Sequence, residues 1–126
     1  MTPIFIRKDW TNTTNKIVGL RKPGFIHRKD WEWAFGIIAM KKFNKLNDKC
    51  TTICIGAGRE VLFYLSNHLK HVYATDIYDG KEWNNFASSD FPENPRKYAQ
   101  FPYKEDVLTV LRMDGTKIEF PSRLFI

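Results

Sequence analysis

A glycine turn and an acidic residue are the parts of this chain whose types and spacing could do chemistry. Gly56-Ala57-Gly58 follows the apolar run Thr51–Ile55, and Asp76 ends the next apolar run. Glycine lets the backbone approach a ligand closely, and a helix start offers free N–H groups. The carboxylate of Asp76 could accept hydrogen bonds from both hydroxyls of a ribose, each contributing roughly 1.5–3 kcal/mol. Strand, glycine turn, helix, strand and acid form the layout of a nucleoside-binding half-fold.

A second acidic candidate, Asp114, follows Met113 at the end of a third apolar run. Its carboxylate could accept a hydrogen bond from the exocyclic amine of a base, with Met113 packing on the base plane. Each candidate also has a purely structural interpretation. Asp114 could form an Asp-Gly turn, and Asp76 could begin a turn that includes Asp79-Gly80. The glycine turn could join a strand to a helix without any ligand.

The elements that must position these residues are three strands and one helix. Apolar and β-branched runs predict the strands, and a leucine stripe predicts the helix. The strands are expected at Thr51–Ile55, Val72–Thr75 and Val107–Arg112, and the helix at Glu60–Leu69. A short helical connection makes the first two strands parallel with a right-handed crossover. Ligands in such sheets bind at the carboxyl ends of the strands, where the glycine turn and both acids fall.

The remaining segments are expected to be less regular. Residues 1–29 are predicted to be irregular, with a polar turn cluster at residues 11–15. A helix is predicted from Asp30, acting as its N-cap, to about Leu46. Residues 79–105 are predicted to be loop-rich, with one helical turn around Lys81–Phe86, and Lys117–Phe120 is predicted to be a short extended piece.

Length and composition predict a single globular domain in a chain of 126 residues, with 43% hydrophobic and 15% aromatic residues. No apolar run approaches the roughly 20 residues of a membrane span. The first ten residues carry charges where a signal peptide needs its apolar core. We therefore expect a soluble cytoplasmic protein with no membrane partner.

Charge is unevenly distributed along the chain. Residues 1–50 hold 11 Lys and Arg against 4 Asp and Glu, whereas residues 51–126 hold 9 against 10. We expect a basic N-terminal segment, residues 1–50, with one helix. Such a segment could attract phosphate or nucleic acid, or simply be a solvated face. No nucleic-acid-binding motif accompanies the charge, so nucleic acid is not an expected partner.

Other reactive residue types point to no site. Cys50 and Cys54 are expected to be reduced, half-buried thiols, since two cysteines are too few for a disulfide scaffold. His68 and His71 lack a visible third ligand, so no metal site is predicted. No arrangement typical of a catalytic triad or a P-loop is found, and no catalytic residue can be named.

Two classes of nucleoside ligand use this layout. A dinucleotide fold requires G-x-G-x-x-G, and Val61 occupies the third glycine position. The segment instead resembles the class I S-adenosylmethionine-dependent methyltransferases, particularly the small type 11 group. The resemblance covers about residues 51–121. It lies in ICIGAGRE, similar to the family's glycine motif, YATDIY, similar to its second-strand acid, and LTVLRMDGTKIEFP, similar to its third-strand segment.

The resemblance implies a Rossmann-like three-layer α/β sandwich and S-adenosylmethionine as cofactor. Glycines of the turn would line the methionine and ribose portions, Asp76 would bind the ribose hydroxyls, and Met113 with Asp114 would frame the adenine. The cofactor-binding residues that it implies are Gly56, Ala57, Gly58, Asp76, Ile77, Met113 and Asp114. Two positions depart from the family pattern: Cys54, where the family often has an acid, and Glu60, where it has a third loop glycine.

The family continues through four further strands after the point at which this chain ends, so residues 51–126 are expected to form a partial domain, truncated after the third parallel strand. In the family's strand order the first strand is central. Without the fourth strand, Thr51–Ile55 becomes an edge that invites self-association. The main functional alternative is a non-catalytic interaction module that docks a partner through this edge or through the basic N-terminal face.

Overall fold

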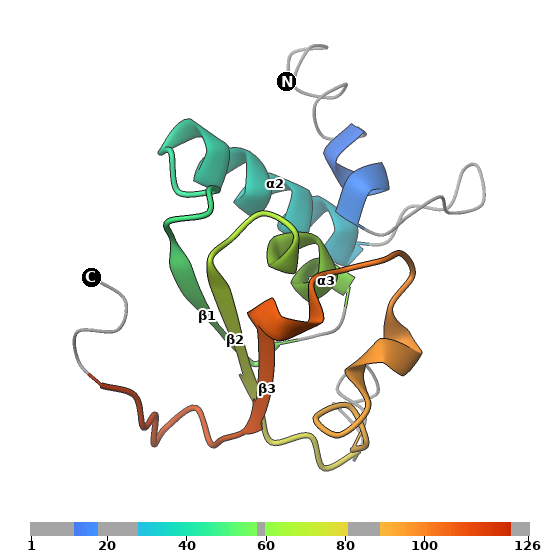
Figure 1. Cartoon of the computed structure of the whole chain (residues 1–126), viewed down its shortest axis with the longest axis vertical. Helices are drawn as coiled ribbons and strands as arrows, with labels where there is room; N and C mark the ends of the chain where they lie inside the picture. Colours follow the sequence, from blue (N-terminus) through green and yellow to red (C-terminus); the bar gives the residue numbers. More distant parts are fainter. Residues whose placement is uncertain (1–11, 18–27, 58–59, 81–88, 122–126) are drawn as a thin grey trace. The chain divides into compact units, whose positions relative to one another are not determined.

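The computed structural model describes residues 12–17, 28–57, 60–80 and 89–121 (Figure 1). The chain divides into two compact units, Met1–Leu46 and Asn47–Ile126. Each unit is described by itself. Gly58 and the helical turn predicted around Lys81–Phe86 lie outside the described residues.

The first unit contains a short helix at residues 12–17 and the helix α2 (Arg28–Lys42). The prediction of an irregular segment with a polar turn cluster is therefore wrong for residues 12–17. Thr13 and Ile17, one helical turn apart, are both buried. Burial of this stripe outweighs the weak helix propensity of Thr and Asn. The N-cap prediction is also wrong, because Asp30 lies inside the first turn of α2, where its charge favours the helix dipole.

The end of α2 is set by Asn44 and comes earlier than the predicted Leu46. Asn44 has a φ of 55°, in the left-handed region that Asn tolerates better than most residues. The N–H of Lys45 donates to the carbonyl of Met40 at 2.8 Å, and the N–H of Asn44 donates to that of Lys41 at 3.1 Å. This pair of bonds is a Schellman motif, which closes the helix before its apolar pattern runs out.

The second unit is a small α/β fold built on an open, three-stranded parallel sheet, as predicted. Its strands are β1 (Thr51–Ile55), β2 (His71–Asp76) and β3 (Leu108–Arg112), in the spatial order β1-β2-β3. The helix α3 (Glu60–Ser66) connects β1 to β2 and packs against β2 and β3 (Figure 1). The register aligns Ile55 with Thr75 and Asp76 with Arg112, so all three strands end at nearly the same level.

The two faces of the sheet differ in burial. One face carries the buried side chains of Val72, Ala74 and Leu108. Leu108 is the β3 residue that is aligned with Val72. The opposite face carries the half-buried Ile53, Tyr73 and Leu111 together with the buried Thr75. Parallel sheets are usually covered on both faces, and on this one the ring of Phe120 packs against Tyr73 at a centroid distance of 5.1 Å.

An aromatic cluster joins the segment after β2 to α3. Phe63, Tyr78 and Phe91 are fully buried, and Phe91 contacts both other rings at centroid distances of 6.2 and 5.6 Å. Phe63 also meets the ring of Tyr103 at 4.8 Å. The loop-rich prediction agrees with the described residues 89–105 except for two 3-10 helices, η2 (Pro95–Tyr98) and η3 (Glu105–Val107). Residues 117–120 follow a turn and do not form a strand.

Candidate ligand-binding site

The glycine turn begins directly at the end of β1. Gly56 has a φ of 64°, which a side chain would strain, and a Cβ added there would meet no atom within 4 Å. The N–H of Ala57 donates to the carbonyl of Thr75 at 3.1 Å, and the Thr75 hydroxyl donates to the carbonyl of Cys54 at 3.3 Å. The turn is therefore fixed against β2 while its glycine faces open space.

Asp76 occupies the last position of β2 and is half-buried. One carboxylate oxygen accepts a hydrogen bond from the N–H of Ile77 at 2.6 Å, and the second has no hydrogen-bond partner among the described residues. Ile77 is 54% exposed, although large apolar side chains are usually buried. A free carboxylate oxygen beside an exposed apolar side chain is suited to binding a molecule that combines hydroxyls with a flat apolar ring.

Tyr78 anchors the segment that follows Asp76. It is buried and has a φ of 50°, in the left-handed region that a bulky residue rarely adopts. Its hydroxyl lies 3.5 Å from the carbonyl of Ala57, so the segment after β2 is held next to the glycine turn. Burial, with smaller contributions from Asp76 and Cys54, raises the pKa of Tyr78, which therefore stays neutral.

Met113 and Asp114 continue β3 past its end. The N–H of Met113 donates to the backbone carbonyl of Asp76 at 2.9 Å, which places Met113 next to the acid of β2. One carboxylate oxygen of Asp114 accepts bonds from the N–H and the hydroxyl of Thr116, at 2.8 and 2.7 Å. These bonds lower the pKa of Asp114 and give this residue the turn-forming role that was its structural alternative.

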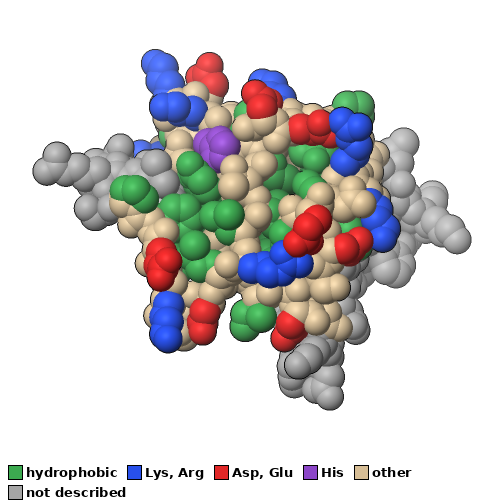
Figure 2. Space-filling model, turned by 60° about the horizontal axis from the view of Figure 1, so that its bottom comes forward, with side chains coloured by type: hydrophobic (Ala, Val, Ile, Leu, Met, Phe, Trp, Pro, Cys, Tyr) green, Lys and Arg blue, Asp and Glu red, His purple; other side chains and the backbone are tan. Residues whose placement is uncertain are grey.

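The ends of β1 and β3 also approach each other. A Cβ added at Gly115 would lie 3.3 Å from Cγ2 of Ile55, so the turn after β3 lies against the last residue of β1. Ile55 is itself 56% exposed. Figure 2 brings forward the side at which the strands end, and hydrophobic side chains gather there among acidic and basic ones. The carboxyl ends thus bring together Gly56, Asp76 and Asp114, with exposed apolar groups between them.

Two of these contacts were missed by the sequence reasoning. Tyr78 and Gly115 were not singled out, yet the first fixes the acid segment and the second lets the β3 turn approach β1. An aromatic residue two positions after the acid was the available signal for Tyr78. Nothing in the sequence alone pointed to the contact between Gly115 and Ile55, because it depends on strand order.

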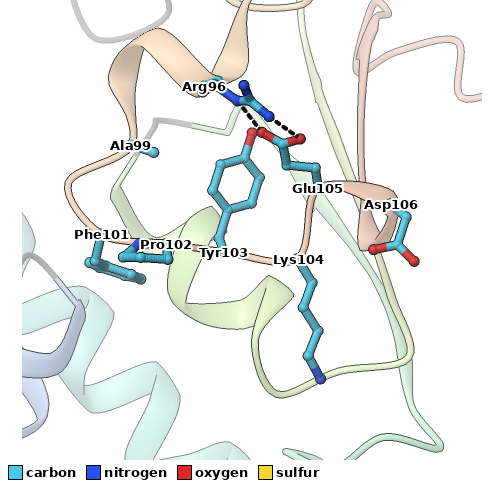
Figure 3. A pocket seen from close by; sticks show the side chains of 8 residues that line it. All are labelled: Arg96, Ala99, Phe101, Pro102, Tyr103, Lys104, Glu105 and Asp106. Atoms are coloured by element: carbon cyan, nitrogen blue, oxygen red, sulfur yellow. Dashed lines mark hydrogen bonds and ion pairs between the residues drawn. The ribbon is translucent and has the colours of Figure 1, made fainter.

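A separate hollow of about 780 Å³ lies near the amino end of β3 (Figure 3). Two of its charged residues form an ion pair, in which Arg96 binds both carboxylate oxygens of Glu105. The ring of Tyr103 extends toward this ion pair, while Lys104 and Asp106 extend away from it. The hollow is lined by Arg96, Ala99, Phe101, Pro102, Tyr103, Lys104, Glu105 and Asp106.

The remaining reactive groups have structural surroundings. Cys50 and Cys54 are both free thiols, and burial raises the pKa of Cys54 to about 11. His71 shares a 2.7 Å hydrogen bond with the Thr109 hydroxyl, whereas His68 lies beside the ring of Tyr64. In the part of the chain that the structure describes, no group of three or more His, Cys, Asp or Glu side chains could hold a metal ion. No helix among these residues is long and apolar enough to cross a bilayer.

Comparisons with protein-family models, with curated proteins and with solved structures find no match to this chain. The class that the observations define is therefore limited to the fold. The second unit is an α/β protein with a parallel sheet whose strands end at a polar and partly apolar edge.

Proposed function

We propose that the second unit binds S-adenosylmethionine at the carboxyl ends of its strands, as the cofactor-binding half of a class I methyltransferase. One observation carries the proposal: the glycine turn, the free carboxylate oxygen of Asp76 and the β3 turn meet at one edge of a parallel sheet. This edge is where ligands of open α/β sheets bind. The proposed architecture is a Rossmann-like three-layer sandwich of which the three strands form part.

Each group would bind a different portion of the cofactor. Gly56, Ala57 and Gly58 would face its methionine and ribose portions. The free oxygen of Asp76 would accept a hydrogen bond from a ribose hydroxyl, and Ile77 with Met113 would pack on the adenine. Asp114 retains one oxygen that is not engaged by Thr116 and could accept from the adenine amine. This assignment uses the exposed apolar side chains, which a purely structural role leaves unexplained.

Methyl transfer needs mainly proximity and orientation of the methyl group against the acceptor. We therefore assign these residues to cofactor binding.

Isothermal titration with S-adenosylhomocysteine tests the proposal directly. We expect micromolar binding by the full chain and an affinity at least about tenfold lower in Asp76→Asn, because a hydrogen bond to a charged group contributes roughly 1.5–3 kcal/mol. Asp106→Asn is the matched control, since Asp106 is an exposed acid near the amino end of β3. Absence of binding heat in the parent chain, or equal affinities of the two variants, would contradict the proposal.

A second candidate function is non-catalytic docking of a partner, which the outer edge of β1 favours. β1 is an edge strand of the sheet and carries no charged residue. Titration separates the two functions, because a docking module would give no heat with S-adenosylhomocysteine.

A further inference from the structure

The outer edge of β1 has unpaired backbone groups among the described residues. β2 is its neighbour in the sheet. The carbonyl of Cys54 accepts a bond from the Thr75 side chain, so it is directed toward β2. Successive backbone groups of a strand alternate in direction, so the N–H and C=O groups of Thr51, Ile53 and Ile55 point away from β2.

The two edges of the sheet are protected to different degrees. Proteins usually guard edge strands with charges, proline or a bulge. β3 ends in Arg112, whose guanidinium binds Glu93 and the carbonyl of Ser89, so a neighbouring segment lies against its end. β1 has the sequence TTICI, with neither charge nor proline, and its last residue is exposed. Among the described residues of the second unit, the less protected edge is therefore that of β1.

We propose that a second copy of this chain docks on this edge, with the two β1 strands antiparallel about a twofold axis at Ile53. This register places Ile53 opposite its own copy and Thr51 opposite Ile55. Each cross-strand pair is then uncharged, and apolar or β-branched residues meet directly. The result is a six-stranded sheet in which the half-buried side chains of Ile53, Tyr73 and Leu111 continue across the interface on one face.

The geometry also determines the size of the assembly. Pairing β1 with β1 is isologous and closes at a dimer, whereas pairing β1 with β3 would be head-to-tail and would grow into a filament. Each chain carries a net charge of +6, so the two copies repel at long range. Added salt screens this repulsion, and we expect it to strengthen the dimer.

Sedimentation equilibrium of the full chain, over a wide range of concentration and at low and moderate salt, tests the proposal. A reversible dimer that tightens with salt is expected. Ile53→Lys places two like charges opposite each other, and the dimer dissociation constant should rise by about tenfold or more. Leu111→Lys is the matched control, with the same change on the same face but on the opposite edge strand. It should leave the dissociation constant within about twofold.

A cross-linking variant keeps the test decisive if Ile53→Lys fails to fold. Opposed residues of an antiparallel pair lie about 4.5–5.5 Å apart at Cα, within the range of a disulfide. In a chain whose native Cys50 and Cys54 are both replaced by Ala, Ile53→Cys should therefore give an oxidised dimer in non-reducing gels, and Leu111→Cys should not. A monomer at every concentration, an open-ended series of larger species, or equal cross-linking of the two variants would overturn the proposal. Binding of S-adenosylhomocysteine by Ile53→Lys is a separate readout, because the proposed cofactor residues lie outside the interface.

Discussion

The two ends of the parallel sheet carry similar types of residue, but their charged groups differ in whether they have partners. At the amino end of β3, Arg96 and Glu105 neutralise each other, and the hollow beside them contains the partly buried ring of Tyr103. At the carboxyl end, Asp76 keeps an oxygen without a partner among the described residues, beside the exposed Ile77. Charged groups that already form an ion pair have little remaining capacity to bind a ligand. A carboxylate oxygen without a partner, next to exposed apolar surface, is still available to the ligand that we propose.

The hollow is a concavity of about 780 Å³, yet concavity alone does not select the better site. Its lining contains the Arg96–Glu105 ion pair. Next to it, the Asn67 side-chain amide donates to the carbonyl of Pro102, and the N–H of Lys104 donates to the Asn67 side-chain oxygen. These contacts fasten the chain before β3 to the end of α3. We therefore interpret the amino end as the part that holds the strands in place, and we propose ligand binding at the carboxyl end.

The largest effect on the free energy of unfolding is expected at the aromatic cluster, because it contacts segments at both ends of the sheet. Phe63 contacts Phe91, which packs on Tyr78, and also contacts Tyr103 near the hollow. Phe63→Ala should lower the free energy of unfolding by about 3–5 kcal/mol, measured by urea denaturation. Phe43→Ala, at a position that is 68% exposed, should change it by no more than about 0.5 kcal/mol. Similar losses in the two variants would show that the cluster does not unite the ends.

The next largest effect on the free energy of unfolding is expected at the glycine turn. Two Gly→Ala substitutions, one in the turn and one in a helix, should change this free energy in opposite directions. Gly56→Ala should destabilise by about 1–2 kcal/mol, because a left-handed residue acquires a Cβ although space is available. Gly36 lies within α2 with open space around it, and Gly36→Ala should stabilise by about 0.5–1 kcal/mol. Thermal unfolding monitored by circular dichroism compares the two. Equal signs would mean that the left-handed conformation of Gly56 does not constrain the turn.

The sequence predicted the strands well and the connections poorly, for physical reasons. The bounds of β1 matched the prediction, β2 is one residue longer than predicted at each end, and β3 begins one residue later than predicted. Short β-branched runs between polar segments have few other ways to be buried. The helix at residues 12–17 was missed because Thr and Asn favour turns, and only tertiary burial reveals the stripe. The end of α2 was placed too late because the left-handed Asn44 interrupts an apolar pattern that continues past it.

The sequence predicted the residues of the candidate site but not the contacts that these residues make. Gly56, Asp76 and Met113 lie together because strand order and register bring their strands to one level. The spacing predicted that convergence through the rule for parallel sheets. It could not predict that Thr116 occupies one oxygen of Asp114, since a two-residue turn bond and a ligand bond require the same residue types.

A smaller effect on the free energy of unfolding is expected in alkaline solution, where the Cys54 thiol near the carboxyl end of the sheet titrates. Burial raises the pKa of Cys54 from 9.0 to about 11, so the folded protein keeps a thiol where the unfolded chain becomes a thiolate. The unfolded state therefore releases a proton first, and the free energy of unfolding should fall as the pH rises from 9.0 toward 11. Cys54→Ala should flatten this decline between pH 9 and 10, before the raised pKa of Tyr78 adds a similar loss. Cys50→Ala should retain the decline in the same denaturation series, and loss of it there would assign the effect to the wrong thiol.

The smallest effect is expected at the amino end, where Arg96 and Glu105 form an exposed ion pair. Arg96 lowers the pKa of Glu105, so the pair stabilises the fold at neutral pH and loses this contribution as the pH falls below 4.5. With 77% of the Arg96 side chain exposed, water screens the attraction, and Glu105→Gln should shift the thermal midpoint by only a few degrees, about 3 °C at most. It should also leave S-adenosylhomocysteine binding unchanged, in contrast to Asp76→Asn. A large loss of ligand affinity in Glu105→Gln would move the binding function from the carboxyl end of the sheet to the hollow at its amino end.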